Sequence, residues 1–218
     1  MTGRPAGRIA IVGGTGRLGL GLARRLARAG AGAQVLIGSR DPARARAAAA
    51  DAGLDPEAGR GNAEAAELAE IVILTVPAEA HAVTVAGLAP VLAGKIVVDT
   101  TLSYDRSTRT IVLVDGLSAA ERAQRLVPGA RVVAGFQTVS WTMLADLDRP
   151  LRGDVLLCGN DRDAKAQVGA VVRQVPMRPV DVGTLEQARL LEQLGGLLMA
   201  LNRRYGKKDL GIVIAGLE

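Results

Sequence analysis

The sequence predicts an α/β fold: a Rossmann-like, doubly wound parallel sheet followed by a small C-terminal α+β domain. Short apolar runs alternate with helical patterns, as expected for strands covered on both faces. The first run, residues 9–12, enters a glycine-rich turn and then a helical pattern. Beyond Trp141 the alternation changes to a smaller unit. We therefore expect a Rossmann domain over residues 1–150 and a small domain over residues 151–218.

The glycine-rich turn has the spacing of a dinucleotide-binding motif. Gly14, Gly16 and Gly19 fill the positions of G-x-G-x-x-G. In order, these glycines permit a tight turn, close approach to a pyrophosphate, and helix–strand packing, while the phosphates meet the helix N-terminus. Three glycines alone are a weak signal, but a predicted helix (18–29) and strand (34–37) complete the βαβ unit. The candidate phosphate-binding residues are Gly14, Thr15, Gly16, Arg17, Leu18 and Gly19.

The end of the second strand indicates which dinucleotide binds. A NAD site places Asp or Glu about 20 residues beyond the glycines to bind the ribose 2′-hydroxyl. This chain has Gly38-Ser39-Arg40 there, and a guanidinium beside a hydroxyl suits a 2′-phosphate. We predict NADP, with a NAD-preferring site as the alternative. Asp41 and Pro42 are expected to be the N-cap and first residue of the next helix.

Composition excludes several functions. No apolar block approaches the roughly 18 residues of a membrane span, and residues 1–5 lead into the first strand without a secretory signal, which predicts a cytoplasmic protein with no membrane partner. One cysteine, Cys158, forbids an internal disulfide, and with one histidine the chain lacks the usual ligands of a zinc site, so no metal is expected. The net charge of +5 suggests nucleic acid, but four aromatic residues and no nucleic-acid motif argue against it. The arginines either form a solvated surface or attract anionic cofactors.

Two later strands should also end at the ligand-binding edge of the sheet. The apolar run 71–76 ends at Pro77, and strand 96–99 ends before two threonines. Because ligands lie beyond the carboxyl ends of parallel strands, we expect contacts with the dinucleotide from the first exit and with the substrate from the second. The residues concerned are Val76, Pro77 and Ala78 at the first exit, and Thr100, Thr101, Ser103 and Tyr104 at the second.

Three further side chains are open to two interpretations each. His81, in the first turn of the helix after Pro77, either contacts the cofactor or donates a proton, or it is a packing or capping residue; the second interpretation is favoured. Arg106 and Arg109 either hold an acidic tail or face water, and the water-facing interpretation is favoured.

The longest predicted helix, residues 185–205, carries a broad apolar stripe with Gly195-Gly196 in its middle. A glycine pair inside a helix indicates that something packs very close. Another helix of this chain, a symmetry mate or a cofactor ring would satisfy this, and we expect a homodimer contact.

Several segments together resemble the family of coenzyme F420-dependent NADP oxidoreductases. They are residues 9–40, 71–77, 158–161 and 178–183, the helix around 188–192, and residues 209–212. The resemblance implies NADPH on the Rossmann-like domain and a deazaflavin ring stacked on the nicotinamide in an interdomain cleft. Thr15, Ser39 and Arg40 match NADP-binding positions, and Val76-Pro77-Ala78 another nucleotide contact. The segment Gln137, Thr138 and Val139 would meet the second ring. The family has histidine where this chain has Gln137, and proline where it has Ser140.

The predicted activity is hydride transfer between NADP(H) and coenzyme F420. The cofactors carry such chemistry while the fold positions the two rings, so no catalytic side chain is singled out. The alternatives are an NADPH-dependent reductase of a pterin or flavin, and a non-catalytic NADP-binding sensor. A hydroxy-acid dehydrogenase is disfavoured because it needs a positioned base.

Overall fold

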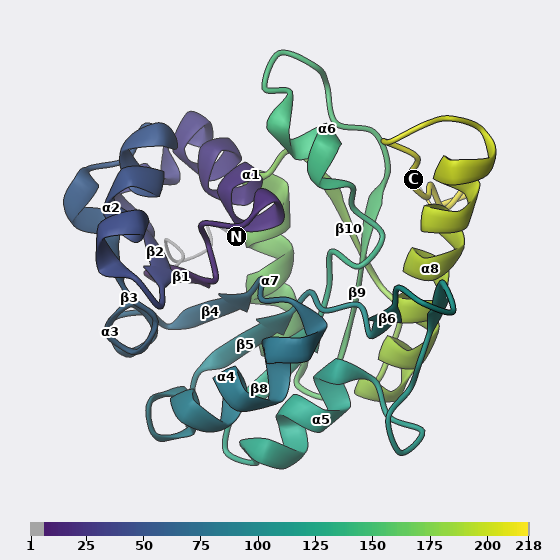
Figure 1. Cartoon of the computed structure of the whole chain (residues 1–218), viewed down its shortest axis with the longest axis horizontal. Coiled ribbons are helices and arrows are strands. Elements are labelled where there is room, and N and C mark those ends of the chain that lie inside the picture. The colour runs from purple at the N-terminus through teal and green to yellow at the C-terminus, as the bar shows by residue number, and fades with distance from the viewer. Residues whose placement is uncertain (1–6, 218) are drawn as a thin grey trace.

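The computed structural model describes residues 7–217 and contains an eight-stranded sheet covered by helices (Figure 1). The strand order is β10-β9-β8-β5-β4-β1-β2-β3. The strands of this sheet are β1 (Ile9–Val12), β2 (Val35–Ser39), β3 (Gly59–Gly61), β4 (Ile71–Leu74), β5 (Ile96–Asp99), β8 (Arg131–Ala134), β9 (Asp154–Gly159) and β10 (Arg178–Asp181). Residues 1–5, on which the expected lack of a secretory signal depends, lie outside the described residues.

The helices alternate with the strands, as the predicted doubly wound fold requires. They are α1 (Arg17–Leu26), α2 (Pro42–Asp51), α3 (Asn62–Glu67), α4 (Ala78–Leu92), α5 (Ala119–Leu126), α6 (Trp141–Ala145), α7 (Arg162–Gln174) and α8 (Ala188–Arg204). A two-stranded hairpin of β6 (Tyr104–Asp105) and β7 (Thr110–Ile111) lies outside the main sheet. None of the helices within residues 7–217 is long and apolar enough to cross a membrane.

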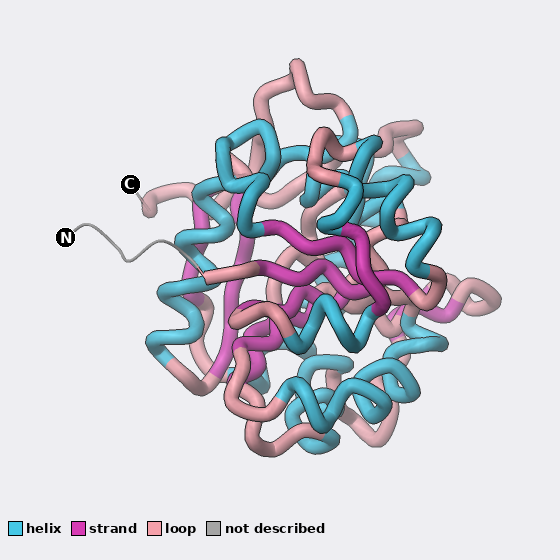
Figure 2. The backbone as a smooth tube through the Cα atoms, turned by 90° about the vertical axis from the view of Figure 1, so that its left-hand side faces the viewer, coloured by secondary structure: helices cyan, strands magenta, loops and turns pink. Residues whose placement is uncertain are grey.

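The core lies on both faces of the sheet, as Figure 2 shows by the helices on either side of the strands. In β1, Ile9 and Ile11 belong to the apolar cluster that contains residues of α1, α2, α6 and α7. Ala10 and Val12 belong to the cluster that contains residues of α3, α4, α5 and α8. Because successive strand residues point to opposite faces, a continuous apolar run is what a doubly covered strand needs.

Local capping groups mark several helix ends, and the start of α2 lies where the sequence predicts it. Asp41 Oδ1 accepts a hydrogen bond from Ala43 N at 2.9 Å, and Pro42 begins α2. Ser118 and Glu121 form a reciprocal capping box at the start of α5. The first predicted helix is shorter than expected, because α1 ends at Leu26 and continues as a π-helical turn that contains Gly30 at φ +83°.

The C-terminal strands extend the main sheet. β9 pairs antiparallel with β8, and β10 pairs parallel with β9. The division of the chain at residue 150 remains a prediction. The last residues are held against this region: Arg178 donates two hydrogen bonds of 2.7 Å to the Asp154 carboxylate, which also accepts one from Ile214 N at 2.7 Å. The bonds from Arg178 hold the pKa of Asp154 below its ordinary value.

Candidate active site

The glycine-rich turn joins β1 to α1 and depends on four glycines rather than three. Gly13 adopts φ +74°, a left-handed conformation that favours glycine, so it makes the sharp turn that we expected of Gly14. A Cβ on Gly14 would lie 2.7 Å from Ile11 O, and one on Gly19 would lie 2.7 Å from Gly14 Cα. The predicted close packing of helix on strand is therefore present. Gly16 is less restricted, with its nearest atom at 3.3 Å.

The first turn of α1 leaves backbone N–H groups available to a ligand. Its N-cap, Gly16, supplies no side chain, and no acidic residue lies in the first turn. An uncapped helix N-terminus with a favourable dipole suits a phosphate. Beside it, the Arg17 guanidinium carbon lies 4.6 Å from the centre of the Trp141 ring, a cation–π contact between α1 and α6. Thr15 and Leu18 are half-buried in the same turn.

The end of β2 offers positive and neutral polar groups. Ser39 is buried, and its Oγ accepts a hydrogen bond from Asp41 N at 3.2 Å, which leaves the hydroxyl hydrogen free to donate. Arg40 is exposed. The nearest acid in sequence, Asp41, is committed to capping α2 through Ala43 N and Arg44 N. The acid at this strand end is therefore engaged in capping through its Oδ1, unlike the free carboxylate expected of a NAD site.

The exit of β4 lies against the glycine turn. A Cβ on Gly13 would lie 2.9 Å from Val76 Cγ1, and the Thr75 hydroxyl donates to Val12 O at 2.9 Å. Pro77 is the N-cap residue of α4, which begins at Ala78. The expected neighbours Val76, Pro77 and Ala78 thus lie at the same sheet edge as the phosphate-binding turn.

A buried histidine–aspartate pair lies at the end of β5. His81 Nε2 is 2.6 Å from Asp99 Oδ2, and neither side chain has exposed surface. Burial alone would raise the pKa of Asp99, but the charge and hydrogen bond of His81 and the Thr101 N–H outweigh it, so this pKa lies below its ordinary value. His81 has no exposed surface for a direct cofactor contact in this conformation, and the geometry fits the packing interpretation.

Two carboxylates hold the loop that follows β5. Asp99 Oδ1 accepts from Thr101 N at 2.9 Å, and Glu192 Oε2, from α8, accepts from Ser103 N at 2.8 Å. The other oxygen of Glu192 accepts from Ala119 N at 2.6 Å. Burial raises the pKa of Glu192. The Thr100 hydroxyl donates to Leu74 O and is therefore committed to the strand.

The segment that follows β8 carries the side-chain amide of Gln137, whose nitrogen is hydrogen-bonded within the described residues and whose oxygen is not. Phe136 adopts φ +71° although it is not glycine, which is a strained backbone conformation at the start of this exit. Gln137 Nε2 donates to Asp99 O at 2.8 Å, which fixes the amide. Its Oε1 is buried and has no hydrogen-bond partner among residues 7–217, and the same holds for Thr101 Oγ1 and His81 Nδ1. Thr138 and Val139 are buried beside it.

The glycine pair of α8 packs within this chain. A Cβ on Gly195 would lie 2.6 Å from a Leu102 methyl and 2.7 Å from Gln137 O, and one on Gly196 would lie 2.7 Å from Ile111 Cγ1. The expectation that a second subunit explains these glycines is wrong, because the loop after β5, the exit of β8 and the hairpin fill the space.

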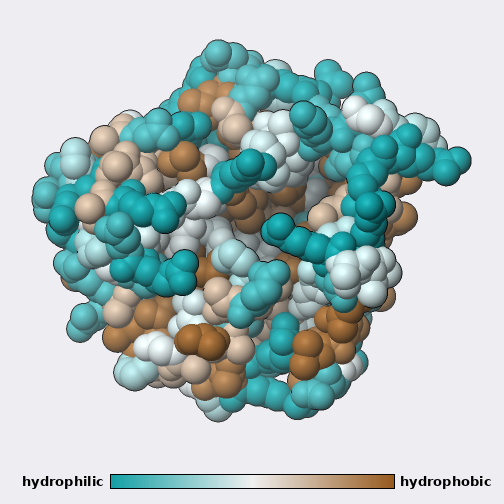
Figure 3. Space-filling view, in the orientation of Figure 1, coloured by the Kyte–Doolittle hydropathy of each residue, from teal (hydrophilic) through white to brown (hydrophobic). Residues whose placement is uncertain are grey.

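The predicted residues therefore gather at one edge of the sheet. Figure 3 shows the surface hollowed near its centre, between the half that carries α1 and α2 and the half that carries α8. Sequence reasoning missed the roles of Asp99 and Glu192. A signal existed for each: Asp99 is an acid that ends an apolar strand, and Glu192 is an acid on the buried side of an amphipathic helix.

Comparison with known proteins decides the family. Residues 8–103 match the model of the family described as NADP oxidoreductase, coenzyme F420-dependent. The F420-dependent NADP reductase of Methanocaldococcus jannaschii is 39% identical over 97% of this chain and 99% of its own length. This chain belongs to the F420-dependent NADP oxidoreductase family. The corresponding reductase of Methanothermobacter marburgensis is 40% identical over 96% of this chain and 99% of its own length.

The family's fold also agrees with the structure. A crystal structure of an Arthrobacter sp. FB24 protein assigned as an F420-dependent NADP reductase superposes with a TM-score of 0.79 at 30% identity, covering 95% of this chain and 99% of that one. The predicted family and fold class are thus confirmed. As a member of this family, the chain is an oxidoreductase.

Proposed function

We propose that this family member transfers a hydride between NADP(H) and coenzyme F420 at the carboxyl edge of its sheet. When bound, NADP(H) and F420 would supply the nicotinamide and deazaflavin rings between which the hydride moves in either direction, with a proton exchanged with solvent to balance reduction of the deazaflavin. The chain's own residues bind both molecules, hold the two rings at roughly 3–3.5 Å and exclude water. The observation that carries the NADP half is the end of β2, where Ser39 and Arg40 are available and Asp41 is committed to capping.

The NADP half of the site fits its cofactor residue by residue. In the proposal, the backbone of the glycine turn and the free N–H groups of α1 bind the pyrophosphate, and Ser39 and Arg40 bind the 2′-phosphate. Val76, Pro77, Ala78 and Thr100 border the nicotinamide half. His81 acts through Asp99 as a positioning residue, because it is enclosed and bonded to that carboxylate.

The acceptor half fits a ring with hydrogen-bonding edges. Gln137 Oε1 and Thr101 Oγ1 are buried without partners among the described residues, and buried polar atoms are normally hydrogen-bonded. An acceptor ring with N–H and carbonyl groups would supply those partners, provided that its binding opens the loop after β5 enough to expose these enclosed atoms. We propose that Gln137, Thr138 and Val139 border this ring.

The deciding experiment follows NADPH oxidation with purified protein and a panel of acceptors: F420, flavins and pterins. Rapid NADPH-dependent reduction of F420 alone supports the proposal. Faster turnover of a flavin or pterin would replace F420 as the acceptor. Tight NADPH binding with no turnover of any acceptor would favour the sensor alternative.

We further propose that the protein works as a homodimer in the cytoplasm. Leu190 and Leu197 are more than half exposed on one side of α8, and an apolar stripe of this kind is typical of a subunit contact. Sedimentation equilibrium tests the dimer directly. A monomer at micromolar concentration, with Leu190→Gln and Leu197→Gln variants behaving identically, would contradict it.

A further inference from the structure

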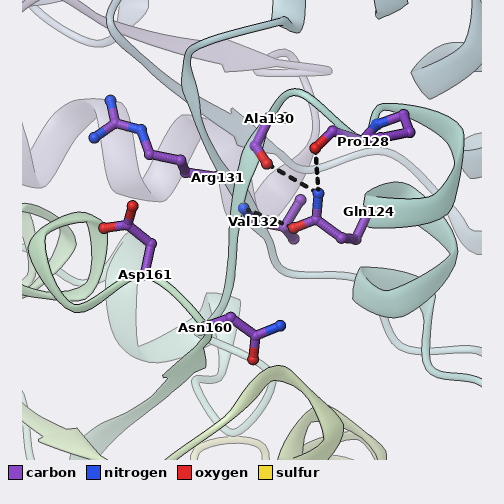
Figure 4. A pocket seen from close by; sticks show the side chains of 7 residues that line it. All are labelled: Gln124, Pro128, Ala130, Arg131, Val132, Asn160 and Asp161. Carbon is purple, nitrogen blue, oxygen red and sulfur yellow. Dashed lines mark hydrogen bonds between the residues drawn. The ribbon is translucent and has the colours of Figure 1, made fainter.

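Two pockets, one near each end of the strands, differ in whether their polar side chains are already engaged in contacts within the chain. The pocket in Figure 4, of about 450 Å³, lies at the start of β8. Its Gln124 amide donates to Ala130 O at 2.9 Å and accepts from Val132 N at 3.4 Å. Asn160 Oδ1 accepts from Leu185 N, and Asp161 caps α7. These amide and carboxylate groups already stabilise the fold, and the Arg131 guanidinium donates to Gly94 O at 3.4 Å, so this pocket offers little to a ligand.

The other pocket, of about 550 Å³, adjoins the proposed active site. Ala78 and Ser103 connect it to the exits of β4 and β5, and the β6–β7 hairpin and α5 form its other walls. Its charged lining residues are Glu79, Asp105, Arg106 and Arg122. A volume of this size accommodates part of a cofactor-sized ligand.

Arg122 is a charged group of this pocket that lacks a counter-ion among residues 7–217. It is half-buried on α5, its Nη2 donates to Ser103 Oγ at 3.1 Å, and its buried Nε has no partner among residues 7–217. No carboxylate within those residues lies in salt-bridge range of Arg122 or Arg106. The neighbouring acid Glu121 is bonded to Arg189 on α8.

The two acids of the pocket do not neutralise this guanidinium. Asp105 Oδ1 accepts bonds from Ser107 N at 2.7 Å and Ser107 Oγ at 2.6 Å, so it stabilises its own turn. Glu79 is exposed at the first turn of α4. A half-buried arginine with an unpartnered N–H in a ligand-sized pocket is suited to a carboxylate or phosphate.

We infer that this pocket binds an anionic group on the side chain of the hydride acceptor, with Arg122 as its principal contact. The inference rests on the proposed function, because it assigns the pocket to the molecule whose ring lies in the adjoining cleft. F420 carries a phosphate and carboxylates on that side chain. The ring would then be recognised beside Gln137 and the side chain beside Arg122, from a different element of the fold.

The test compares F420 with a 5-deazaflavin that has the same ring but an uncharged ribityl side chain. Equilibrium binding of both compounds and of NADPH is measured for the wild type, Arg122→Gln and the matched control Arg125→Gln. Arg125 lies one turn further along α5, is exposed and does not line the pocket. We expect Arg122→Gln to weaken F420 binding about tenfold, the loss of one charge-assisted contact. Binding of the uncharged deazaflavin and of NADPH should stay within about twofold, and Arg125→Gln should change none of the three.

A second variant, Glu79→Gln, should change the affinity for F420 in the opposite direction and have little effect on folding. Because Glu79 is exposed and lines the same pocket, Glu79→Gln should tighten F420 binding a few-fold and leave the uncharged deazaflavin unaffected. Raising the salt concentration should reduce both effects, since it screens exposed charges.

Each other outcome contradicts the inference in a distinguishable way. Equal weakening of both deazaflavins by Arg122→Gln would mean that Arg122 only supports the fold through Ser103. Weakened NADPH binding would assign the anion to the dinucleotide. If the wild type binds neither deazaflavin, the proposed function fails and the pocket assignment fails with it.

Discussion

In each half of the site, a glycine inside a helix lies so close to a neighbouring segment that a side chain would not fit there. The two glycines differ in which segments they contact. Gly19 of α1 meets Gly14 Cα, five residues earlier in the same motif, and Thr75 Oγ1 after β4. Gly195 of α8 meets Leu102 and Gln137 O, which are distant in sequence. The dinucleotide half therefore combines backbone contacts inside one motif with contacts to the exit of β4, whereas the glycine of the acceptor half packs only on segments distant in sequence.

The largest expected effect is that of Gly19→Ala. The new methyl would lie 2.7 Å from both Gly14 Cα and Thr75 Oγ1, and backbone cannot move aside cheaply. Overpacking of this kind costs about 1–3 kcal/mol of unfolding free energy, and distortion of the turn should reduce NADPH affinity at least tenfold. Urea unfolding and NADPH titration measure the two effects. The control is Gly87→Ala on α4, where a Cβ would lie within 4 Å of no atom of residues 7–217 outside its own helix backbone, and stability should rise by about 0.5–1 kcal/mol. Unchanged NADPH binding in Gly19→Ala would contradict the close-packed turn.

Gly195→Ala should affect the other half of the site. Its methyl would press on the flexible end of Leu102, which can yield, but also on Gln137 O, which is held by the strand exit. We expect a several-fold higher KM for the acceptor with NADPH affinity near that of the wild type. Steady-state kinetics with each substrate varied in turn separates the two constants. A rise in the KM for NADPH alone would show that α8 does not border the acceptor.

Arg40→Ala sharpens the comparison within the NADP half. Loss of the guanidinium should weaken NADPH binding about tenfold, roughly 1.4 kcal/mol, and leave NADH binding almost unchanged. Binding titrations with both dinucleotides measure this difference. Equal losses for the two would defeat the assignment of Arg40 to the 2′-phosphate.

Gln137→Ala should impair turnover with the true acceptor while NADPH affinity stays near the wild-type value. Because an amide does not titrate, acceptor affinity should vary little between pH 5 and 8 in the wild type. Gln137→His should improve activity with F420 if another ring is the natural acceptor, and change it little if F420 is already the substrate. Weakened NADPH binding with unimpaired turnover would place this segment outside the acceptor site.

The smallest expected effect is the pH dependence of the unfolding free energy. The contributions of the two buried carboxyl groups, Glu192 and Asp99, change with pH in opposite directions. Burial raises the pKa of Glu192 above its ordinary 4.5, so its contribution to stability is present below that value and is lost as pH rises through the raised pKa. The pKa of Asp99 is lowered from 3.8, so its contribution is present above that value and is lost as pH falls through the lowered pKa. Urea unfolding should show wild-type stability falling, relative to Glu192→Gln, as pH rises above 4.5. A flat difference between the two proteins would contradict the raised pKa.

The difference between the dinucleotide half and the acceptor half explains which features of the site could be predicted from the sequence. The glycine turn, Ser39-Arg40 and the N-cap Asp41 each depend on local chemistry, so their arrangement could be predicted. The sheet core could be predicted as well, because doubly covered strands need continuous apolar runs.

The acceptor half could be predicted only in part. Nothing local indicates that Gly195 packs on Leu102, or that Glu192 bonds Ser103 and Ala119, because these contacts bring together residues about 70 to 90 positions apart. The short elements β3, β6, β7 and α6 escape periodicity for another reason: they have between two and five residues, too few to repeat a pattern.

The composition of the outermost strands has a consequence for self-association. β10 lies at one margin of the sheet and includes Pro179, which has no N–H to offer an added strand, while β3 at the other margin is only three residues long. Neither margin is a good template for intermolecular β-pairing. Copies of this chain that meet at high concentration during synthesis are therefore directed away from aggregation through the margins of the main sheet.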